Sequence, residues 1–328
     1  TTIKISDAFL NIFSSESYNI QRFYSPDFEK KLVDVLGMQK PDVVLMESLF
    51  MTPYIPAIRK CSDAKIVLRA HNVEYVIWER LTLNEKNLAK KIYLGMLTRR
   101  LRKYETKTIN QVDALLPITP DDQSFFNSMG CRVPMFVAPV GIDTDAYNGM
   151  PEIKNELCLF HLGAMDWRPN LEGIDWFLDK CWEPIHTRFP DLMLYLAGRG
   201  FPDRLMKKSG DSIKCFGEIT DAIQFMNGKQ ILIVPLKSGG GMRVKIIQGM
   251  AMGKTIISTT IGAEGIAATN GKNILIGDAP EEILAQVEKC MLDKSFCYQI
   301  GNEARKLVME NYSNQTIGRK LMIFLKGI

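Results

Sequence analysis

Short runs of apolar, largely β-branched residues recur along the whole chain, and helical patterns separate them. Strands buried on both faces read as continuous apolar runs, and a crossover helix between consecutive strands makes them parallel. The alternation therefore predicts an α/β protein built on parallel sheets. The expected strands are VVLME (43–47), KIVLRA (65–70), ALLPIT (114–119), LCLFHLG (157–163), LMLYLAG (192–198), SIKCFG (212–217), ILIVPL (231–236), TIISTT (255–260) and NILIGD (273–278).

One stretch of the chain breaks the periodicity. FVAPVGIDTDAYNGMPEIKNE (136–156) gathers proline, glycine and polar residues, as linkers do. Since 328 residues exceed the usual size of one domain, we expect a first Rossmann-like domain over 1–140 and a second over 141–310. A C-terminal helix over 311–328 can cross back to the first domain. Residues 1–40 show no opening strand with a glycine turn, so we expect the first domain to lack its opening βαβ unit.

Several classes of protein are excluded by what the chain lacks. Seven scattered cysteines without a C-x-x-C pair indicate reduced thiols, and three widely spaced histidines do not form a zinc site. Asp143 and Asp145 are a weaker candidate for a divalent metal, but they lie in the linker, and we expect no metal. No apolar run is long enough to cross a bilayer, and the N-terminus does not read as a signal peptide. We therefore expect a soluble, cytoplasmic protein.

The most informative motif is VPLKSGGGMRVKIIQGMAMGKTIISTTIGAEGI (234–266). Gly239–Gly241 follow an apolar strand, and a helical pattern begins directly after them. Glycines at such a junction let an anion approach bare N–H donors at the positive end of a helix. The helix dipole disfavours cations there, yet Arg243 and Lys245 stand in the first turn, so an external anion or a nearby acid must balance them. The motif predicts a diphosphate site; the alternative is a flexible turn with solvated basic residues.

Two more strand ends carry candidate residues. In HLGAMDWRPNLEGIDWFL (161–178), Gly163 ends a strand before a helix that we expect to begin near Asn170, and Arg168 can supply charge for a phosphate. The strand KIVLRA runs directly into His71. Ligands bind at the carboxyl ends of the strands in open α/β sheets, so we expect His71 to face the site. The alternative for His71 is a hydrogen bond to local backbone.

Residues 80–108 are strongly basic and helical. Nine lysines and arginines stand against Glu85 and Glu105, a net charge of +7, and leucines recur among them. This pattern favours contact with an anionic membrane surface, and a solvated basic face is the alternative. Nucleic acid is not expected as a partner, because single-strand sites interleave many aromatic residues with basic ones.

Together these segments resemble the retaining nucleotide-sugar glycosyltransferases of the GT-B fold, family 4, in a bacterial polysaccharide-type branch. The matching segments are FVAPVGIDTDAY, LGAMDWRPNLEGIDWFL, LYLAGRG and VPLKSGGGMRVKIIQGMAMGKTIISTTIGAEG, and RAHNVEYVIWER resembles the family's first-domain histidine segment. The resemblance implies two Rossmann-like domains that face a cleft. It also implies transfer of a sugar, with retention of configuration, from a UDP- or GDP-sugar to a glycan or lipid-linked acceptor, without a metal or a cofactor.

The resemblance also assigns roles to residues. The diphosphate would lie on the backbone of Gly240, Gly241 and Met242, with Arg243 and Lys245 as its cations and Gly163 opposite. Phe216 and Gly217 would flank the base. His71 would stabilise the positive charge that develops on the donor sugar, and such enzymes need no protein nucleophile.

Two positions depart from the family pattern. The family commonly carries two glutamates eight positions apart, and here Gly240 and Gln248 stand in their places. Gln248 can still hydrogen-bond ribose hydroxyls, whereas Gly240 has no side chain with which to contact the sugar. Two alternatives therefore stay open: a non-catalytic GT-B subunit that binds a nucleotide sugar or a partner transferase, and a nucleotide-sugar epimerase. We expect a cytoplasmic protein that can lie peripherally on the inner face of the membrane.

Overall fold

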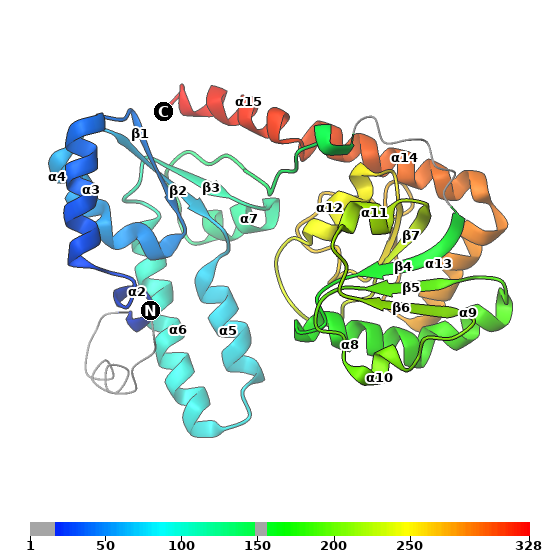
Figure 1. Cartoon of the computed structure of the whole chain (residues 1–328). Helices are drawn as coiled ribbons and strands as arrows, with labels where there is room; N and C mark the ends of the chain where they lie inside the picture. Colours follow the sequence, from blue (N-terminus) through cyan, green and yellow to red (C-terminus); the bar gives the residue numbers. More distant parts are fainter. Residues whose placement is uncertain (1–16, 148–155) are drawn as a thin grey trace. The chain divides into compact units, whose positions relative to one another are not determined.

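The computed structural model describes residues 17–147 and 156–328, which form two compact units (Figure 1). The first unit runs to Pro139 and takes in Lys320–Ile328, and the second is Val140–Arg319. The division falls beside the boundary expected at residue 140, and the second unit continues past residue 310. Both units are α/β with parallel sheets, as the alternation of apolar runs predicts.

In its described residues the first unit contains a three-stranded parallel sheet in the order β1-β2-β3. The expected strand at 114–119 is shorter, because Thr119 caps the next helix by accepting a hydrogen bond from the Asp122 N–H and Pro120 suits its first turn. The elements are α2 (Tyr18–Gln21), α3 (Pro26–Gln39), β1 (Val43–Glu47), η1 (Leu49–Tyr54), α4 (Ile55–Cys61), β2 (Lys65–Ala70), α5 (Glu74–Asn84), α6 (Leu88–Thr108), β3 (Ala114–Pro117) and α7 (Pro120–Ser128).

The two faces of this sheet pack against different parts of the chain. Ile66 and Leu68 of β2 face the core formed with the helices that precede and follow it, whereas Val67 between them faces the other side. That second face is covered by the C-terminal residues, where Phe324 stacks on Phe136 at 5.6 Å between ring centroids. The end of the chain therefore completes the burial of the first sheet.

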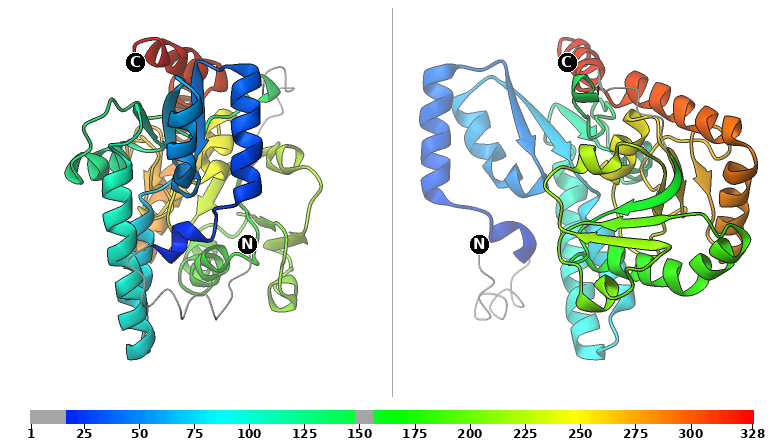
Figure 2. Two further views of the ribbon diagram at one scale, coloured as in Figure 1. Left: turned by 90° about the vertical axis from the view of Figure 1, so that its left-hand side faces the viewer. Right: turned by 45° about the vertical axis from the view of Figure 1, so that its right-hand side comes forward.

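The second unit contains a six-stranded parallel sheet in the order β6-β5-β4-β7-β8-β9. Alternate strand residues feed two separate cores, one on each face, so helices cover both sides of the sheet (Figure 2). The elements are η2 (Asp145–Tyr147), β4 (Glu156–Leu162), α8 (Arg168–Trp176), η3 (Phe177–Cys181), α9 (Trp182–Arg188), β5 (Leu194–Ala197), α10 (Asp203–Met206), β6 (Ile213–Gly217), α11 (Ala222–Met226), β7 (Lys229–Val234), α12 (Val244–Ala251), β8 (Thr255–Ser258), β9 (Leu275–Ile276), α13 (Pro280–Leu292), α14 (Lys294–Asn311) and α15 (Asn314–Leu325).

Two helix boundaries differ from expectation. The basic stretch 80–108 is not one helix: α5 ends at Asn84, and Asn87 caps α6 by accepting a hydrogen bond from the Lys90 N–H. Helix α8 begins at Arg168 rather than near Asn170, because Pro169 is well suited to a first helical turn. Among the helices of the described residues, none is both long and apolar enough to cross a bilayer.

Candidate active site

The ends of β4 and β7 are neighbours in the second sheet. Strands β5 and β6 extend the sheet on one side of β4, and strands β7 to β9 extend it on the other. The strand order therefore reverses between β4 and β7. Ligands of open α/β sheets bind at such a switch point, outside the carboxyl ends of the strands. The loop after β4 contains Gly163, and the loop after β7 contains Gly239–Gly241, so the fold brings two of the expected segments together.

The loop after β7 has a backbone that only glycine adopts easily. The φ angles of Gly239 and Gly241 are 108° and 82°, both in the left-handed region. A Cβ on Gly239 would also lie 2.8 Å from Nη2 of Arg243 and 3.3 Å from the ring of Trp167. The glycines therefore leave bare backbone in front of α12, with Arg243 directly behind it.

Arg243 is buried, with 7% of its surface exposed. Its Nη1 donates to the carbonyl oxygen of Gly240 at 2.6 Å, and its guanidinium lies 4.9 Å from the centre of the Trp167 ring. Its Nε and Nη2 are buried without a hydrogen-bond partner. Burial lowers the pKa of Arg243, and the charge of Glu264 acts in the opposite direction. Two unsatisfied donors on a buried cation are costly, and an anion bound at this place would satisfy them.

Lys245 lies two residues further along the chain and is held by neutral groups. Its Nζ donates to Oδ1 of Asn170 at 2.7 Å and lies 3.4 Å from Nε2 of His161. Within the described residues no carboxylate forms an ion pair with it. Burial, together with the charge of Arg243, lowers the pKa of Lys245 to about 7. Two cations thus stand together at the positive end of α12, as a diphosphate requires.

His161 helps to orient the side chain of Lys245. It is fully buried, and burial together with the charge of Lys245 holds its pKa well below the ordinary value, so the ring is neutral. Nδ1–H donates to the carbonyl oxygen of Ile233 at 2.7 Å, which leaves the Nε2 lone pair toward Lys245. A Cβ on Gly163 would come within 2.9 Å of the polar ends of His161, Asn170 and Lys245. The absence of a side chain at Gly163 therefore leaves space for the polar ends of His161, Asn170 and Lys245.

Arg168 lies outside this group. Its side chain is exposed on the first turn of α8 and pairs with Glu172, with Nε and Oε1 2.6 Å apart. Glu172 in turn accepts from the hydroxyl of Ser238 at 3.0 Å, which ties α8 to the start of the glycine loop. The charge of Arg168 is thus already balanced by an acid, in contrast to Arg243 and Lys245.

The residues expected near the base and the ribose lie on other elements. Phe216 is half exposed at the end of β6, with its ring edge-on to Phe225 at 5.6 Å, and Gly217 has a φ of 65°. Gln248 lies on α12 and hydrogen-bonds the hydroxyl of the buried Tyr147. Phe216 thus offers an exposed aromatic face, and a hydrogen bond fixes the amide of Gln248.

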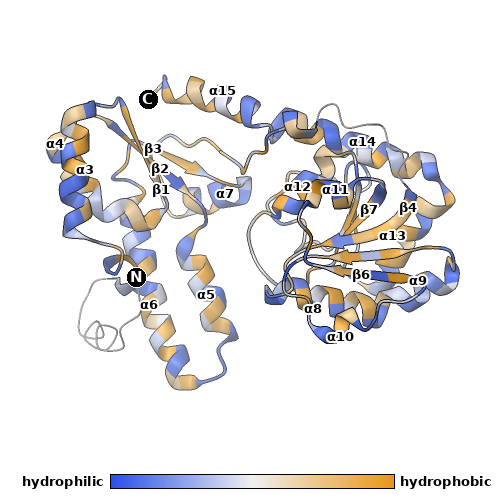
Figure 3. Cartoon of the chain, in the orientation of Figure 1, coloured by the Kyte–Doolittle hydropathy of each residue, from blue (hydrophilic) through white to orange (hydrophobic). Residues whose placement is uncertain are grey.

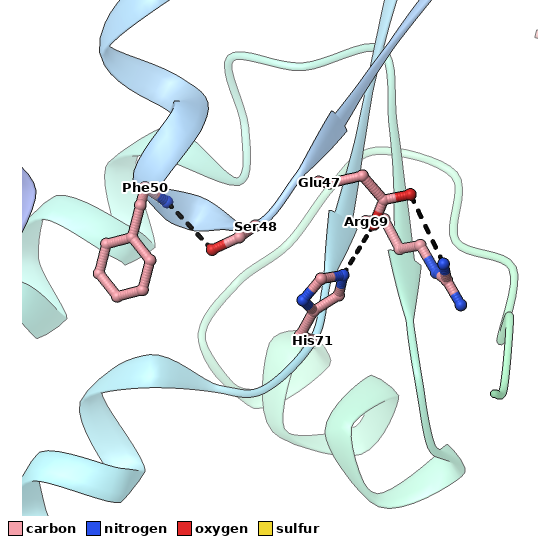
Figure 4. A network of polar contacts seen from close by, with 5 residues as sticks. All are labelled: Glu47, Ser48, Phe50, Arg69 and His71. Carbon is pink, nitrogen blue, oxygen red and sulfur yellow. Dashed lines mark hydrogen bonds and ion pairs between the residues drawn. The ribbon is translucent and has the colours of Figure 1, made fainter. Parts of the chain in front are cut away.

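In the first unit His71 directly follows β2, and the structure gives it a partner that sequence reasoning missed. Nε2 of His71 lies 2.7 Å from Oε2 of Glu47, the last residue of β1, and the other carboxylate oxygen lies 3.5 Å from Nη1 of Arg69 (Figure 4). Glu47 and Arg69 are paired in the parallel register of β1 and β2. The next residue, Ser48, has a φ of 95°, which turns the chain away at once.

Three residues of these sites could have been suspected from the sequence by one signal. Glu47 is a carboxylate at the end of an apolar strand, His161 interrupts another such strand, and Asn170 stands in a first helical turn. Each is a polar residue where burial or a strand end is expected, which calls for a partner.

The two aspartates of the linker make local hydrogen bonds. Asp143 accepts from the Asp145 N–H, and Asp145 accepts from Gln315.

The comparison with known families agrees with this geometry. The family model described as "Glycosyl transferases group 1" matches residues 156–293, which include β4, the glycine loop and α12. The second unit carries a glycosyl transferases group 1 domain. The chain is also 29% identical over 302 residues to an uncharacterized 44.6 kDa protein in the cps region of Klebsiella pneumoniae, covering 88% of this chain and 75% of the relative.

Solved structures show the same fold at low sequence identity. Alr3699/HepE of Anabaena, in complex with UDP, is 14% identical with a TM-score of 0.68, covering 92% of this chain and 82% of that one. A glycosyltransferase from Rickettsia africae ESF-5 is 16% identical with a TM-score of 0.69, covering 92% and 80%. The chain therefore has the GT-B fold, as its sequence motifs suggest.

Proposed function

We propose that this glycosyltransferase moves a sugar from a UDP- or GDP-sugar to a glycan or lipid-linked acceptor with retention of configuration. The observation that carries the proposal is the pair of cations at the positive end of α12. Arg243 is buried with two unsatisfied donors, and the partly buried Lys245 is held by neutral groups. Alr3699/HepE has been solved with UDP and with UDP-glucose, which supports the choice of donor. The relative from a cps region supports a polysaccharide acceptor.

The proposed roles follow from the placement of each group. The diphosphate accepts from the backbone around Gly240–Met242 and from Arg243 and Lys245, while Phe216 and Gly217 lie beside the base and Gln248 beside the ribose. The acceptor oxygen bonds to the anomeric carbon as the bond to the phosphate oxygen breaks, and the departing nucleoside diphosphate takes the acceptor's proton. His71, oriented by Glu47, stabilises the positive charge on the sugar ring. These steps need no metal.

Donor binding is tested by calorimetric titration of the chain with UDP, GDP and their common sugars, with and without EDTA. We expect one nucleotide series to bind in EDTA, and Arg243→Ala to weaken it by about 1–3 kcal/mol, the scale of a charge-assisted contact. The matched control is Arg204→Ala in the same unit, because Arg204 is exposed and paired with Asp175. Equal losses in the two variants would remove Arg243 from the site.

Transfer is tested by incubating the binding-competent donor with candidate acceptors and following the anomeric signals by NMR. Retention predicts that the new linkage keeps the anomeric configuration of the donor. Donor binding without transfer or hydrolysis would instead favour the non-catalytic subunit, which the absence of a side chain at Gly240 motivates. Interconversion of free UDP-sugars without an acceptor would favour the epimerase.

We also propose that the chain contacts the inner membrane surface peripherally through residues 80–108, where a lipid-linked acceptor would be found. The net charge of +7 in this stretch supports an anionic surface as the partner.

A further inference from the structure

Helices α5 and α6 form a hairpin whose inner part is well packed. Glu105 on α6 accepts from the N–H groups of Glu74 and Tyr75 at the start of α5, both at 3.0 Å. Further along, the hydroxyls of Thr82 and Thr98 lie 3.2 Å apart, and Leu97 and Leu101 of α6 are buried. This part of the hairpin is an ordinary piece of the first unit's core.

The outer end of the hairpin has an ordered turn. Oε1 of Glu85 accepts from the Asn87 N–H at 3.0 Å, and Oε2 of Glu85 lies 2.6 Å from Nζ of Lys90. Nζ of Lys91 donates to the carbonyl oxygen of Leu83 at 3.2 Å. These contacts fix the directions of the side chains at the tip, so their exposure is not the result of a frayed helix end.

The tip, defined as residues 81–92, displays apolar side chains that nothing in the described residues covers. Leu81, Leu83, Leu88 and Ile92 are 53%, 67%, 72% and 67% exposed. Hydrophobic and hydrophilic segments alternate along both α5 and α6 (Figure 3). Within the tip, Lys86, Lys90 and Lys91 stand against Glu85 alone. Exposed aliphatic side chains with lysines close by in the same turn match the interface of an anionic bilayer, where leucines enter the acyl boundary and ammonium groups stay among the phosphates.

We propose that the tip inserts Leu81, Leu83, Leu88 and Ile92 into the interface of an anionic lipid bilayer, with its lysines at the headgroups. The proposal narrows the membrane-contacting segment from residues 80–108 to the tip of the hairpin. The binding of the tip to lipid does not depend on the proposed function. Only the idea that this binding brings the donor site close to a lipid-linked acceptor rests on it.

The test is sedimentation of the purified full chain with vesicles of phosphatidylcholine alone or with phosphatidylglycerol, at low and high salt and without nucleotide. We expect binding to the anionic vesicles, weakened but not abolished by salt. Leu83→Ser/Leu88→Ser/Ile92→Ser should lower the partition coefficient at least tenfold. The matched control is Met38→Ser/Leu292→Ser/Ile323→Ser, which removes three equally exposed apolar side chains elsewhere and should change it less than twofold. Lys86→Ala should lower it about fivefold, and Lys208→Ala should not.

Far-UV circular dichroism and thermal unfolding of the first unit show whether each variant remains folded. Titration with the nucleotide that binds wild type separates this proposal from the proposed function. Vesicle binding by a chain that binds no nucleotide would leave the tip proposal standing. The tip proposal is overturned if wild type does not bind anionic vesicles, or if the two triple variants lose binding equally. If wild type does not bind vesicles and the tip variant abolishes dimers in size-exclusion chromatography, the tip contacts a second copy of the chain instead.

Discussion

Lys245 is held by the amide oxygen of Asn170 and the lone pair of His161, and neither group carries a charge. This arrangement keeps the ammonium in place without cancelling its charge, and burial lowers its pKa to about 7. The free site is thus only partly protonated near neutral pH. In the proposed function a bound diphosphate stabilises the protonated form, so donor binding should raise the pKa of Lys245 and take up a proton.

We predict that the affinity for a nucleotide sugar is constant below about pH 7 and falls above it, by up to tenfold per pH unit, until the raised pKa of the complex is reached. A UDP-sugar or GDP-sugar is the proper probe, because its diphosphate does not titrate in this range. Titration calorimetry at pH 7.5 in buffers of different ionisation enthalpy measures the proton uptake. Lys245→Met should abolish it, and uptake that persists in this variant would contradict the assignment to Lys245.

Glu47 and His71 illustrate a second arrangement, in which an acid orients a ring. Because Nε2 faces Glu47, Nδ1 is the ring nitrogen left for another partner. We predict that His71→Ala lowers turnover at least tenfold with little change in donor affinity, and that Glu47→Gln lowers it by a smaller factor in the same direction. Steady-state kinetics with donor Kd measured separately tests both. An equal loss of turnover and donor affinity in His71→Ala would make it a structural residue.

At the scale of elements, the start of α5 is capped by an acid from a different helix. Glu105 of α6 binds two N–H groups that the helix leaves unsatisfied, yet burial raises its pKa to about 7. Burial of Glu74, on the first turn of α5, raises the pKa of that carboxyl as well. The folded state therefore binds a proton at Glu105 more tightly than the unfolded chain does.

The sign of the pH effect follows from this shift. Stability from protonated Glu105 is fully present below the ordinary pKa of 4.5 and is lost as the pH rises through about 7, a change of roughly 3 kcal/mol. We predict that Glu105→Gln removes most of this dependence, as measured by urea unfolding between pH 4.5 and 8. Glu79→Gln, an exposed change on α5, is the control and should leave the profile unaltered. A profile for Glu105→Gln that matches wild type would refute the assignment.

At the scale of the whole molecule, each unit has its own core, and α15 passes from one to the other. The helix begins in the second unit, but Leu321, Phe324 and Leu325 cover the second face of the first sheet, next to Val67 and Leu116. The last residues of the chain are thus part of the stability of the first unit, although they lie furthest from it in sequence.

We predict two transitions in differential scanning calorimetry, one for each unit. Phe324→Ala should lower the stability of the first unit by about 1–3 kcal/mol, while the exposed neighbour change Ile323→Ala costs less than about 0.5 kcal/mol. The nucleotide that binds should raise the other transition. A single transition moved by both Phe324→Ala and nucleotide would mean that the units unfold together.

The sequence by itself determined the strands, the parallel α/β class and the glycine loop with its two cations, because these depend on local apolar runs and on the special backbone of glycine. It did not show the break at residues 85–87, where side-chain capping by Asn87 competes with the helical pattern. It predicted that Arg168 can supply charge for a phosphate, but it did not show that Glu172, one helical turn away, pairs with Arg168.

Only the tertiary structure decided which groups hold the functional side chains. His161 meets Lys245, and Glu47 meets His71, because parallel strands bring residues far apart in sequence to one sheet edge. Only the fold leaves Arg243 with buried, unsatisfied donors and the hairpin tip with uncovered leucines. Local patterns set which elements form, but burial and pairing depend on which distant residues pack there, and no single stretch of sequence carries that information.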